Sequence, residues 1–238
     1  MKLLIVKSLF IPTTDYLQTN INSIKTINLH KYDTTLVLSG WIKNNDDIIK
    51  IKELVEHIKQ YMSNVILDIW NENKGKTYLL NNMYKYNTCQ KNTLLYLDHD
   101  IYIKDDIYDD IESLNDNNMI SFTQYPDNRH NEMVYMNEIT INNKKYNYPT
   151  DNLHMASGCF IVKTNIINLF KTLYSKYIYG EEDILIANLL TEHKYIHLLS
   201  KNRVIHPYDK LKEYDTWKNN MIFKVIGNTK IEIKDSYF

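Results

Sequence analysis

The stretch LLYLDHDIYI, residues 94–103, is the most informative part of the sequence, because it joins a buried strand to two carboxylates. Apolar and aromatic residues lead into Asp98-His99-Asp100, and apolar residues then resume at Ile101. Burying an unpaired charge is costly, so two acids directly after an apolar strand indicate a role at the end of that strand. Side chains alternate along an extended chain, so Asp98 and Asp100 are expected to point the same way. This pattern suits a hard divalent cation. The alternative is a pair of acids in a surface turn.

Upstream of this stretch, strand and helix patterns alternate. Short apolar runs predict strands at residues 2–10, 34–39, 64–70 and 93–98, the second of them closed by Gly40. Apolar residues at helical spacing predict helices between them, at residues 15–28, 46–61 and 77–87. Such a series with short connections predicts an α/β fold with a mostly parallel twisted sheet and helices on both faces. Parallel sheets of this kind bind ligands at the carboxyl ends of their strands.

The downstream half is less regular. Residues 126–152 are polar and Asn-rich, and we expect a long loop or a small hairpin that covers a site. The other elements expected here are strands at 118–124 and 153–163, a helix at 165–177, a helix starting in GEEDILI (180–186), and a segment HLLSKNRVIHP at 197–207. No domain boundary is visible, so we expect one domain over 1–238, with halves at 1–104 and 105–210 and a tail or lid at 211–238.

Composition and charge narrow the class of protein. The 238 residues are 44% hydrophobic and 24% charged, which is ordinary for a globular protein, and the net charge of -1 offers no strong field for nucleic acid. Cys89 and Cys159 form neither a metal spacing nor a disulfide framework, which fits a reducing compartment. No apolar stretch reaches about 18 residues, so we expect no transmembrane helix and a cytoplasmic location. The abundance of Asn, Ile, Lys and Tyr indicates an AT-rich genome, such as that of a large DNA virus, in which case the location is the host cytoplasm.

Four segments, in this order, resemble those of glycosyltransferases with the GT-A fold, of the family-2-like and galactosyltransferase-like kinds. The resemblance covers most of residues 1–210, and it starts from LYLDHD, which is similar to the D-x-D motif of these enzymes. It implies that Asp98 and Asp100 hold Mn²⁺ or Mg²⁺ and that Asp98 also touches the ribose and diphosphate of the donor. The implied reaction is transfer of a hexose from a nucleotide sugar, by family preference a UDP-sugar, to a hydroxyl of a glycan, protein or lipid.

The resemblance also assigns residues outside the acidic pair. The loop with Lys74 and Lys76 and the helix with Asn81 resemble the segment that faces the nucleotide, although a solvated loop is the plain alternative for the lysines. MASGCFIVK resembles a small-residue strand, whose Ser157-Gly158 would let the donor sugar approach. RVIHP resembles a later segment that supplies a histidine to the metal, here His206, which is otherwise a structural histidine.

YGEEDILIANLL resembles the "G-G-E-D-D" region of inverting galactosyltransferase-like enzymes. On that match Glu182 and Asp183 are the catalytic carboxylates, and Asp183 takes the acceptor proton with inversion at the anomeric carbon. Acids at a helix start also stabilise the helix without any function. The sequence departs from the family at LSGW, where an acidic pair for the base is common, at Glu181, where glycine is usual, and at Ile184, where another acid is common. The nucleotide base and the acceptor therefore stay unassigned.

Other functions remain open. A retaining glycosyltransferase and a nucleotidyltransferase of similar fold also use an acidic pair, but SLFIPTTD after the first strand lacks the Gly-rich loop with Arg and Lys of sugar nucleotidyltransferases. A non-catalytic carbohydrate-binding module is the third alternative, and such a domain would be expected to lose the D-x-D motif, which is present here.

Overall fold

Strand β1 (Lys2–Ile11) starts a parallel sheet that the first half of the chain builds by alternating strands and helices. The computed structural model describes residues 2–30, 32–62, 64–87, 93–125, 137–149, 158–173 and 182–206. The other elements of the first half are α1 (Thr14–Lys25), β2 (Asp33–Ile42), α2 (Asn45–Lys59), β3 (Val65–Trp70), α3 (Gly75–Asn82), the 3-10 turn η1 (Met83–Tyr86) and β4 (Thr93–Leu97). They pair in parallel in the order β3-β2-β1-β4. The strands and helices predicted for this half are confirmed, with shifted ends.

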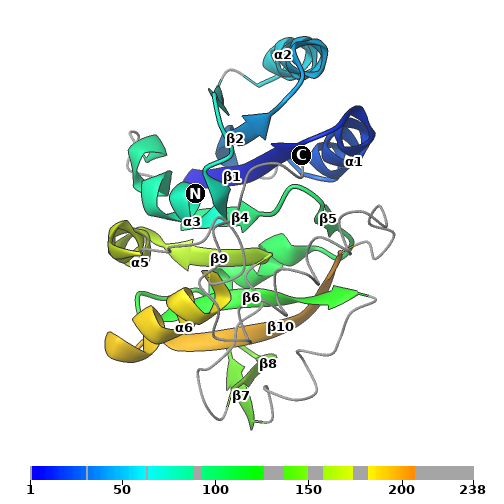
Figure 1. The fold of residues 1–238 in the computed structure, drawn as a ribbon. Helices are drawn as coiled ribbons and strands as arrows, with labels where there is room; N and C mark the ends of the chain where they lie inside the picture. Colours follow the sequence, from blue (N-terminus) through cyan, green and yellow to red (C-terminus); the bar gives the residue numbers. More distant parts are fainter. Residues whose placement is uncertain are drawn as a thin grey trace.

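The second half extends the same sheet with strands of both directions. Its elements are β5 (Tyr102–Ile103), η2 (Ile107–Ser113), β6 (Asn118–Tyr125), β7 (Asn137–Ile141), β8 (Lys144–Tyr148), β9 (Cys159–Lys163), α5 (Thr164–Leu169), η3 (Phe170–Thr172), α6 (Glu182–Glu192) and β10 (Ile196–Ile205). Figure 1 shows the strands stacked from β2 and β1 at the top, through β4, β9 and β6, to β10 and the β7–β8 hairpin. The short strand β5 pairs with the end of β10.

Strand β9 is inserted between β4 and β6 and is antiparallel to both. Because β6 and β10 are parallel to each other, β9 alone runs backwards among the seven strands from β3 to β10 in the described part of the chain. The central sheet is therefore mostly parallel, as predicted. The reversed strand also brings the start of β9 to the edge where β4 and β6 end.

The two faces of the sheet are covered by different helices. Alternation along β1 sends Leu3 and Ile5 to one face and Leu4 and Val6 to the other. The first face packs against α1, α2 and η2, and the second against α3, α5 and α6. This is the arrangement expected of an α/β fold with helices on both faces.

Helix α2 illustrates why these segments form helices. Asn44 caps it by accepting a hydrogen bond from the Asp46 backbone N–H at 3.0 Å. Acids occupy its first turn and basic residues its last, as the helix dipole favours. Its buried stripe consists of Ile51, Val55 and Ile58, at helical spacing. No helix in the described ranges is long and apolar enough to cross a bilayer.

Strand β2 does not end at Gly40, contrary to the prediction, but continues to Ile42. Gly40 is the register partner of Leu9 in β1, and a Cβ atom placed there would collide with the Leu9 carbonyl oxygen. The glycine thus permits close approach of two strands instead of marking a turn.

Of the long loop or small hairpin expected at residues 126–152, the described part forms the hairpin, in which β7 and β8 pair in antiparallel register. The hairpin lies beyond β10 in the strand order, and a role in covering the site stays a prediction. Asn142 and Asn143 form its turn with φ angles of 51° and 62°. Asparagine tolerates this left-handed conformation better than most residues, which explains the tight turn.

Candidate functional site

A row of polar side chains crosses four neighbouring strands at the carboxyl edge of the sheet. Ser8 of β1 lies level with Ser39 of β2, which in turn lies level with Asp68 of β3. Asp98 directly follows the last paired residue of β4 and is level with Ser8. The residues two positions earlier in these strands pack against the α3 side, so alternation places the row on that face. Three strand spacings separate its ends, about 14 Å.

The carboxylate of Asp98 has a cationic and a neutral partner. Its Oδ2 accepts a hydrogen bond from the Lys76 ammonium at 2.8 Å, and its Oδ1 accepts one from the Tyr96 hydroxyl at 2.7 Å. Both carboxylate oxygens are therefore held, and the side chain is fixed at the end of β4. The sequence predicted the position of Asp98 but not its pairing with Lys76.

Lys76 joins the two acidic segments that lie far apart in the sequence. Its ammonium lies 3.9 Å from Oε1 of Glu182, in the first turn of α6, while it binds Asp98. Its side chain is 11% exposed. Burial alone would lower the pKa of Lys76, but Asp98, and then Glu182 and Asp183, outweigh burial and raise it, so the lysine stays charged at neutral pH.

Asp100 pairs with His206, as the resemblance implied that both belong to one centre. Oδ2 of Asp100 lies 3.3 Å from Nε2 of His206 and 3.7 Å from Nε2 of His99. On its other side, Nδ1 of His206 is 3.1 Å from Oε1 of Gln124, which can only accept a hydrogen bond. Nδ1 is therefore the donor in that contact, and Nε2 is the ring nitrogen that faces the Asp100 carboxylate.

Gly158 leaves the space in which these groups meet. Its carbonyl accepts a hydrogen bond from the Asp98 N–H at 2.8 Å. A Cβ atom at Gly158 would lie 2.9 Å from Nε2 of Gln124 and 3.4 Å from Oδ2 of Asp98. A side chain at this position would therefore displace the amide of Gln124, whereas Asp98 would be in ordinary van der Waals contact with it.

Glu182 and Asp183 begin helix α6 on the far side of Lys76. Glu182 is buried and Asp183 is half-buried. Burial raises the pKa of Glu182, Lys76 opposes that shift, and Asp183 adds to it. Two carboxylates with different exposure thus stand next to the D-x-D turn.

Lys7 is a site residue that sequence reasoning missed. It is fully buried in β1, and its ammonium donates a hydrogen bond to the backbone carbonyl of Asp98. Burial lowers the pKa of Lys7 to about 7, against the opposite effects of Asp100 and Asp98. The available signal was a single lysine inside the apolar run LLIVKSLFI.

A second missed group lies at the β3 end of the polar row. Oδ2 of Asp68 accepts hydrogen bonds from Ser39 at 3.1 Å, from the Tyr86 hydroxyl and from Nε1 of Trp70 at 3.4 Å. Within the described residues, Oδ1 of Asp68 accepts none. Trp70 also packs edge-on against Tyr78, with ring centroids 5.1 Å apart. LSGW lacks the acid expected in β2, and the neighbouring strand supplies one at the same level.

The remaining predicted residues lie away from the acidic turn or outside the described ranges. Lys74 is exposed, and its ammonium lies 4.8 Å from the centroid of the Tyr78 ring. Asn81 donates hydrogen bonds to the carbonyls of Lys171 and Leu173 and so ties α3 to the turn after α5. Ser157 and the tail at 211–238 lie outside the described residues.

The described side chains at this edge are of the types that bind the metal implied by the resemblance, but they are not gathered around one point. Among the described residues, no group of three or more His, Cys, Asp and Glu side chains is gathered to hold a metal ion. Asp100 and His206 are in contact, and Oδ2 of Asp98 is held by Lys76. Carboxylate oxygen and imidazole nitrogen suit Mn²⁺, and Nε2 of His206 and Oδ2 of Asp100 lie 3.3 Å apart, so one cation could bind both. The side-chain types fit the metal, and the third donor, the Asp98 carboxylate, is bound to Lys76.

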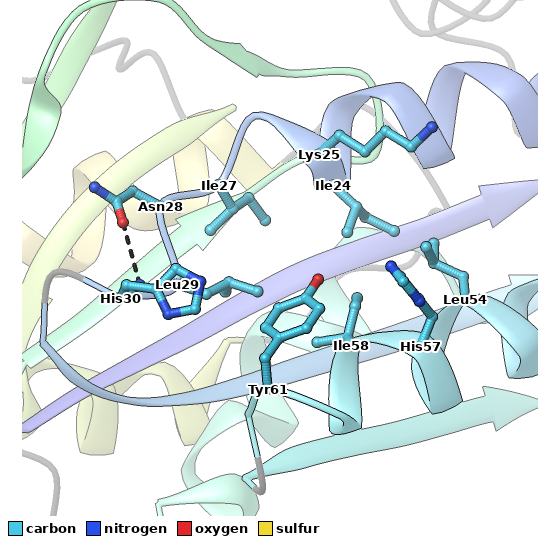
Figure 2. A pocket seen from close by; sticks show the side chains of 10 residues that line it. All are labelled: Ile24, Lys25, Ile27, Asn28, Leu29, His30, Leu54, His57, Ile58 and Tyr61. Carbon is cyan, nitrogen blue, oxygen red and sulfur yellow. Dashed lines mark hydrogen bonds between the residues drawn. The ribbon is translucent and has the colours of Figure 1, made fainter.

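A separate pocket of about 460 Å³ lies between α1 and α2. Figure 2 shows its apolar floor, with Ile24, Ile27 and Ile58, and a polar rim that includes His30 and His57. It is built from the C-terminal parts of both helices, which lead into the amino ends of β2 and β3. It is therefore at the edge of the sheet opposite the polar row, and the row is the candidate site.

The sequence matches no protein-family model and no curated protein. Solved structures of glycosyltransferases do match. GalNAc-T7 with UDP, GalNAc and Mn²⁺ superimposes with a TM-score of 0.65 at 15% identity, over 89% of this chain and 44% of that one. The chain has the GT-A fold.

Two further structures with the GT-A fold are similar over nearly the whole chain. Residues 1–349 of TarS from S. aureus give a TM-score of 0.60 at 15% identity, covering 98% of this chain and 67% of that one. The mannosyltransferase PcManGT from Pyrobaculum calidifontis, in complex with GDP-Man and Mn²⁺, gives 0.61 at 12% identity, covering 97% and 65%. The chain thus spans less than half of GalNAc-T7 and about two thirds of the other two. Identities this low show the fold alone.

Proposed function

We propose that the protein is a metal-dependent glycosyltransferase that moves a hexose from a nucleotide sugar to an acceptor hydroxyl. The observation that carries the proposal is the convergence of Asp98, Asp100, His206 and Glu182-Asp183 at the carboxyl edge of a GT-A sheet. Similar structures bind UDP or GDP-Man together with Mn²⁺. For this chain, the nucleotide sugar and the metal are part of the proposal.

Asp100 and His206 would hold the metal, with Asp98 as the third donor. Bound there, Mn²⁺ or Mg²⁺ supplies positive charge to the departing diphosphate. The hydrogen bond from Nδ1 of His206 to Gln124 orients the ring and directs Nε2 to the centre. The hydrogen bond from Lys7 to the Asp98 carbonyl fixes the turn that carries both acids.

The polar row would carry the nucleoside. It runs about 14 Å from Asp98 to Asp68, which matches the length of a nucleoside diphosphate. The diphosphate would lie at the Asp98 end, close to Lys76, and the base at the Asp68 end. Among the described residues Oδ2 of Asp68 accepts three hydrogen bonds and Oδ1 none, so Oδ1 would accept an N–H donor such as that of uracil. This favours a UDP-sugar as donor.

Asp183 would act as the base. As the acceptor oxygen attacks the anomeric carbon, its proton passes to the Asp183 carboxylate. The new carbon–oxygen bond forms while the bond to the diphosphate breaks, and the diphosphate leaves with that electron pair. One displacement inverts the anomeric configuration. Half-burial keeps Asp183 accessible to an acceptor, whereas Glu182 is buried against Lys76.

Two variants separate donor binding from transfer. Asp100→Asn removes a charged donor to the metal, so Mn²⁺-dependent binding of UDP is expected to weaken at least tenfold in a calorimetric titration. Asp183→Asn removes the base, so UDP binding is expected to persist while glycosyl transfer falls by roughly 10²–10⁴-fold. Normal turnover by both variants, or a product of retained configuration, would contradict these roles.

A further inference from the structure

Lys76 binds a carboxylate oxygen that a metal at this edge would need as a ligand. Its ammonium lies 2.8 Å from Oδ2 of Asp98, and a Cβ atom at Gly158 would lie 3.4 Å from the same oxygen. The amide of Gln124 also lies beside Gly158, and its Oε1 contacts His206, the neighbour of Asp100. A divalent cation that reached this position would compete with Lys76 for Asp98.

We propose that Lys76 is a resident counter-cation of the nucleotide-free protein, which moves from Asp98 to the donor diphosphate and so couples metal binding to nucleotide binding. This inference rests on the proposed function and deepens it, because it states which cation balances the carboxylates of the site when no donor is bound. Lys76 is thus a positioning residue for Asp98 before it becomes a ligand of the diphosphate.

The charges around Lys76 require such a cation. Asp98 and Glu182 both lie within 4 Å of its ammonium, with Asp183 next in the chain and Asp100 two residues from Asp98. Like charges in a partly buried cluster repel strongly unless a cation lies among them. Lys76 offsets that repulsion when no metal is bound, and it links the D-x-D turn to helix α6.

The position of Lys76 allows the exchange without movement of the backbone. It is the second residue of α3, directly after Gly75, whose N–H is held by Asn73 at 3.1 Å. The four-carbon stem of a lysine can redirect its ammonium while the helix start stays fixed. A diphosphate beside Asp98 offers two or more negative charges, which attract the ammonium away from a single carboxylate.

The exchange makes the affinity for Mn²⁺ depend on whether the nucleotide is bound. Without nucleotide, Mn²⁺ must displace the lysine, so it binds weakly. When the nucleotide is bound, its diphosphate binds the Lys76 ammonium, and Oδ2 of Asp98 becomes available to the metal. Each ligand therefore raises the affinity of the other. Removal of the lysine charge should improve binding of Mn²⁺ alone and weaken the coupling.

The test is a titration of the protein with Mn²⁺, in which free Mn²⁺ is followed by electron paramagnetic resonance, first without and then with UDP. We expect Lys76→Met to bind Mn²⁺ alone roughly tenfold tighter than the wild type or more, because one nearby positive charge is gone. Lys76→Arg keeps the charge and should bind Mn²⁺ as weakly as the wild type. The gain in Mn²⁺ affinity on adding UDP should be smaller for Lys76→Met than for the wild type.

Lys74→Met is the matched control in the titration without nucleotide. It removes the same charge two residues away, from an exposed side chain that lies over Tyr78, and should leave Mn²⁺ binding unchanged. If Lys76→Met fails to fold in a thermal melt, Lys76→Gln replaces it with the same expectation. The inference is overturned if the Lys76 variants without charge bind Mn²⁺ no tighter than the wild type, or if Lys74→Met tightens it equally.

Failure of this inference differs from failure of the proposed function. If the wild type binds Mn²⁺ with UDP, and Asp100→Asn abolishes that binding, the metal site stands even when Lys76→Met has no effect. If neither the wild type nor Lys76→Met binds Mn²⁺ with or without UDP, the proposed function and this inference are both contradicted.

Discussion

Gly158 shows how one missing side chain shapes the acidic turn. A Cβ atom there would lie 2.9 Å from Gln124 and 3.4 Å from Asp98. The Gln124 side chain would have to move, and it is the partner of Nδ1 of His206. The glycine thus supports the contact between Asp100 and His206 through Gln124.

Gly158→Ala is therefore expected to weaken Mn²⁺-dependent UDP binding by roughly tenfold, which corresponds to about 1.4 kcal/mol. Because a flexible side chain is displaced, the melting temperature should change little. Calorimetric titration and a thermal melt measure the two effects. Unchanged binding in the variant would contradict the role assigned to Gln124 in holding His206.

At the scale of single residues, the sequence indicated which residues lie at the site better than it indicated which groups they contact. Asp98, Asp100 and His206 were found from an acidic pair after an apolar strand and from a family resemblance, and their contribution to metal binding stays a prediction. Lys7 and Asp68 were missed, because each is a lone charge inside a strand pattern. Their partners come from other strands and turns, so only the folded chain brings those partners into contact.

At the scale of elements, β10 is held to its neighbours by buried polar contacts. Nε2 of His197 lies 2.9 Å from the Ser121 hydroxyl across the pairing of β10 with β6. Burial lowers the pKa of His197 to about 3. The imidazole is therefore neutral in the folded protein over the pH range in which it would gain a proton when unfolded.

This pKa shift predicts an acid dependence of stability. Between pH 3 and about 6.5 the unfolded chain binds a proton at His197 that the folded chain does not, so stability falls as pH falls through that window. The loss approaches about 1.4 kcal/mol per pH unit. Urea unfolding at pH 7 and at pH 5 should show that His197→Gln lacks this part of the loss. An equal loss in both proteins would contradict a neutral buried His197.

A second buried contact ties the β7–β8 hairpin and η2 to β10. Asp110 accepts hydrogen bonds from Tyr146 at 2.8 Å, Ser200 at 2.6 Å and Asn202 at 2.9 Å. Asp110→Ala leaves these donors without their acceptor, and we expect a loss of about 3 kcal/mol in the free energy of unfolding. Glu138→Ala is the control, since that acid pairs with lysines in solvent, and it should change stability by less than about 1 kcal/mol. Equal effects of the two variants would contradict the account.

The elements also show why half of the topology was predictable. Strands β1 to β4 are short apolar runs separated by amphipathic helices, and such a series has one favoured arrangement. The reversal of β9 was not predicted, because a run of buried residues such as CFIVK is apolar on both faces in either direction. Its direction depends on the path of the chain before it.

At the scale of the whole molecule, the GT-A fold is retained at identities of 12–15%. The fold brings the ends of β4 and β6, the start of β9 and the residue after β10 to one edge. We propose that the nucleotide and the metal bind at that edge and that the base lies there, because of its charges and its position. The central claim is that this edge binds a metal and the diphosphate of a nucleotide sugar.

That claim is tested most directly by incubating the protein with UDP-, GDP- and TDP-sugars, with Mn²⁺ or with EDTA, and measuring the nucleoside diphosphate released. The account predicts release from at least one donor, first of all a UDP-sugar, in the presence of Mn²⁺, with none in EDTA and none from Asp100→Asn. Absence of both release and binding for every donor in the presence of Mn²⁺, by a protein that melts cooperatively, would contradict it.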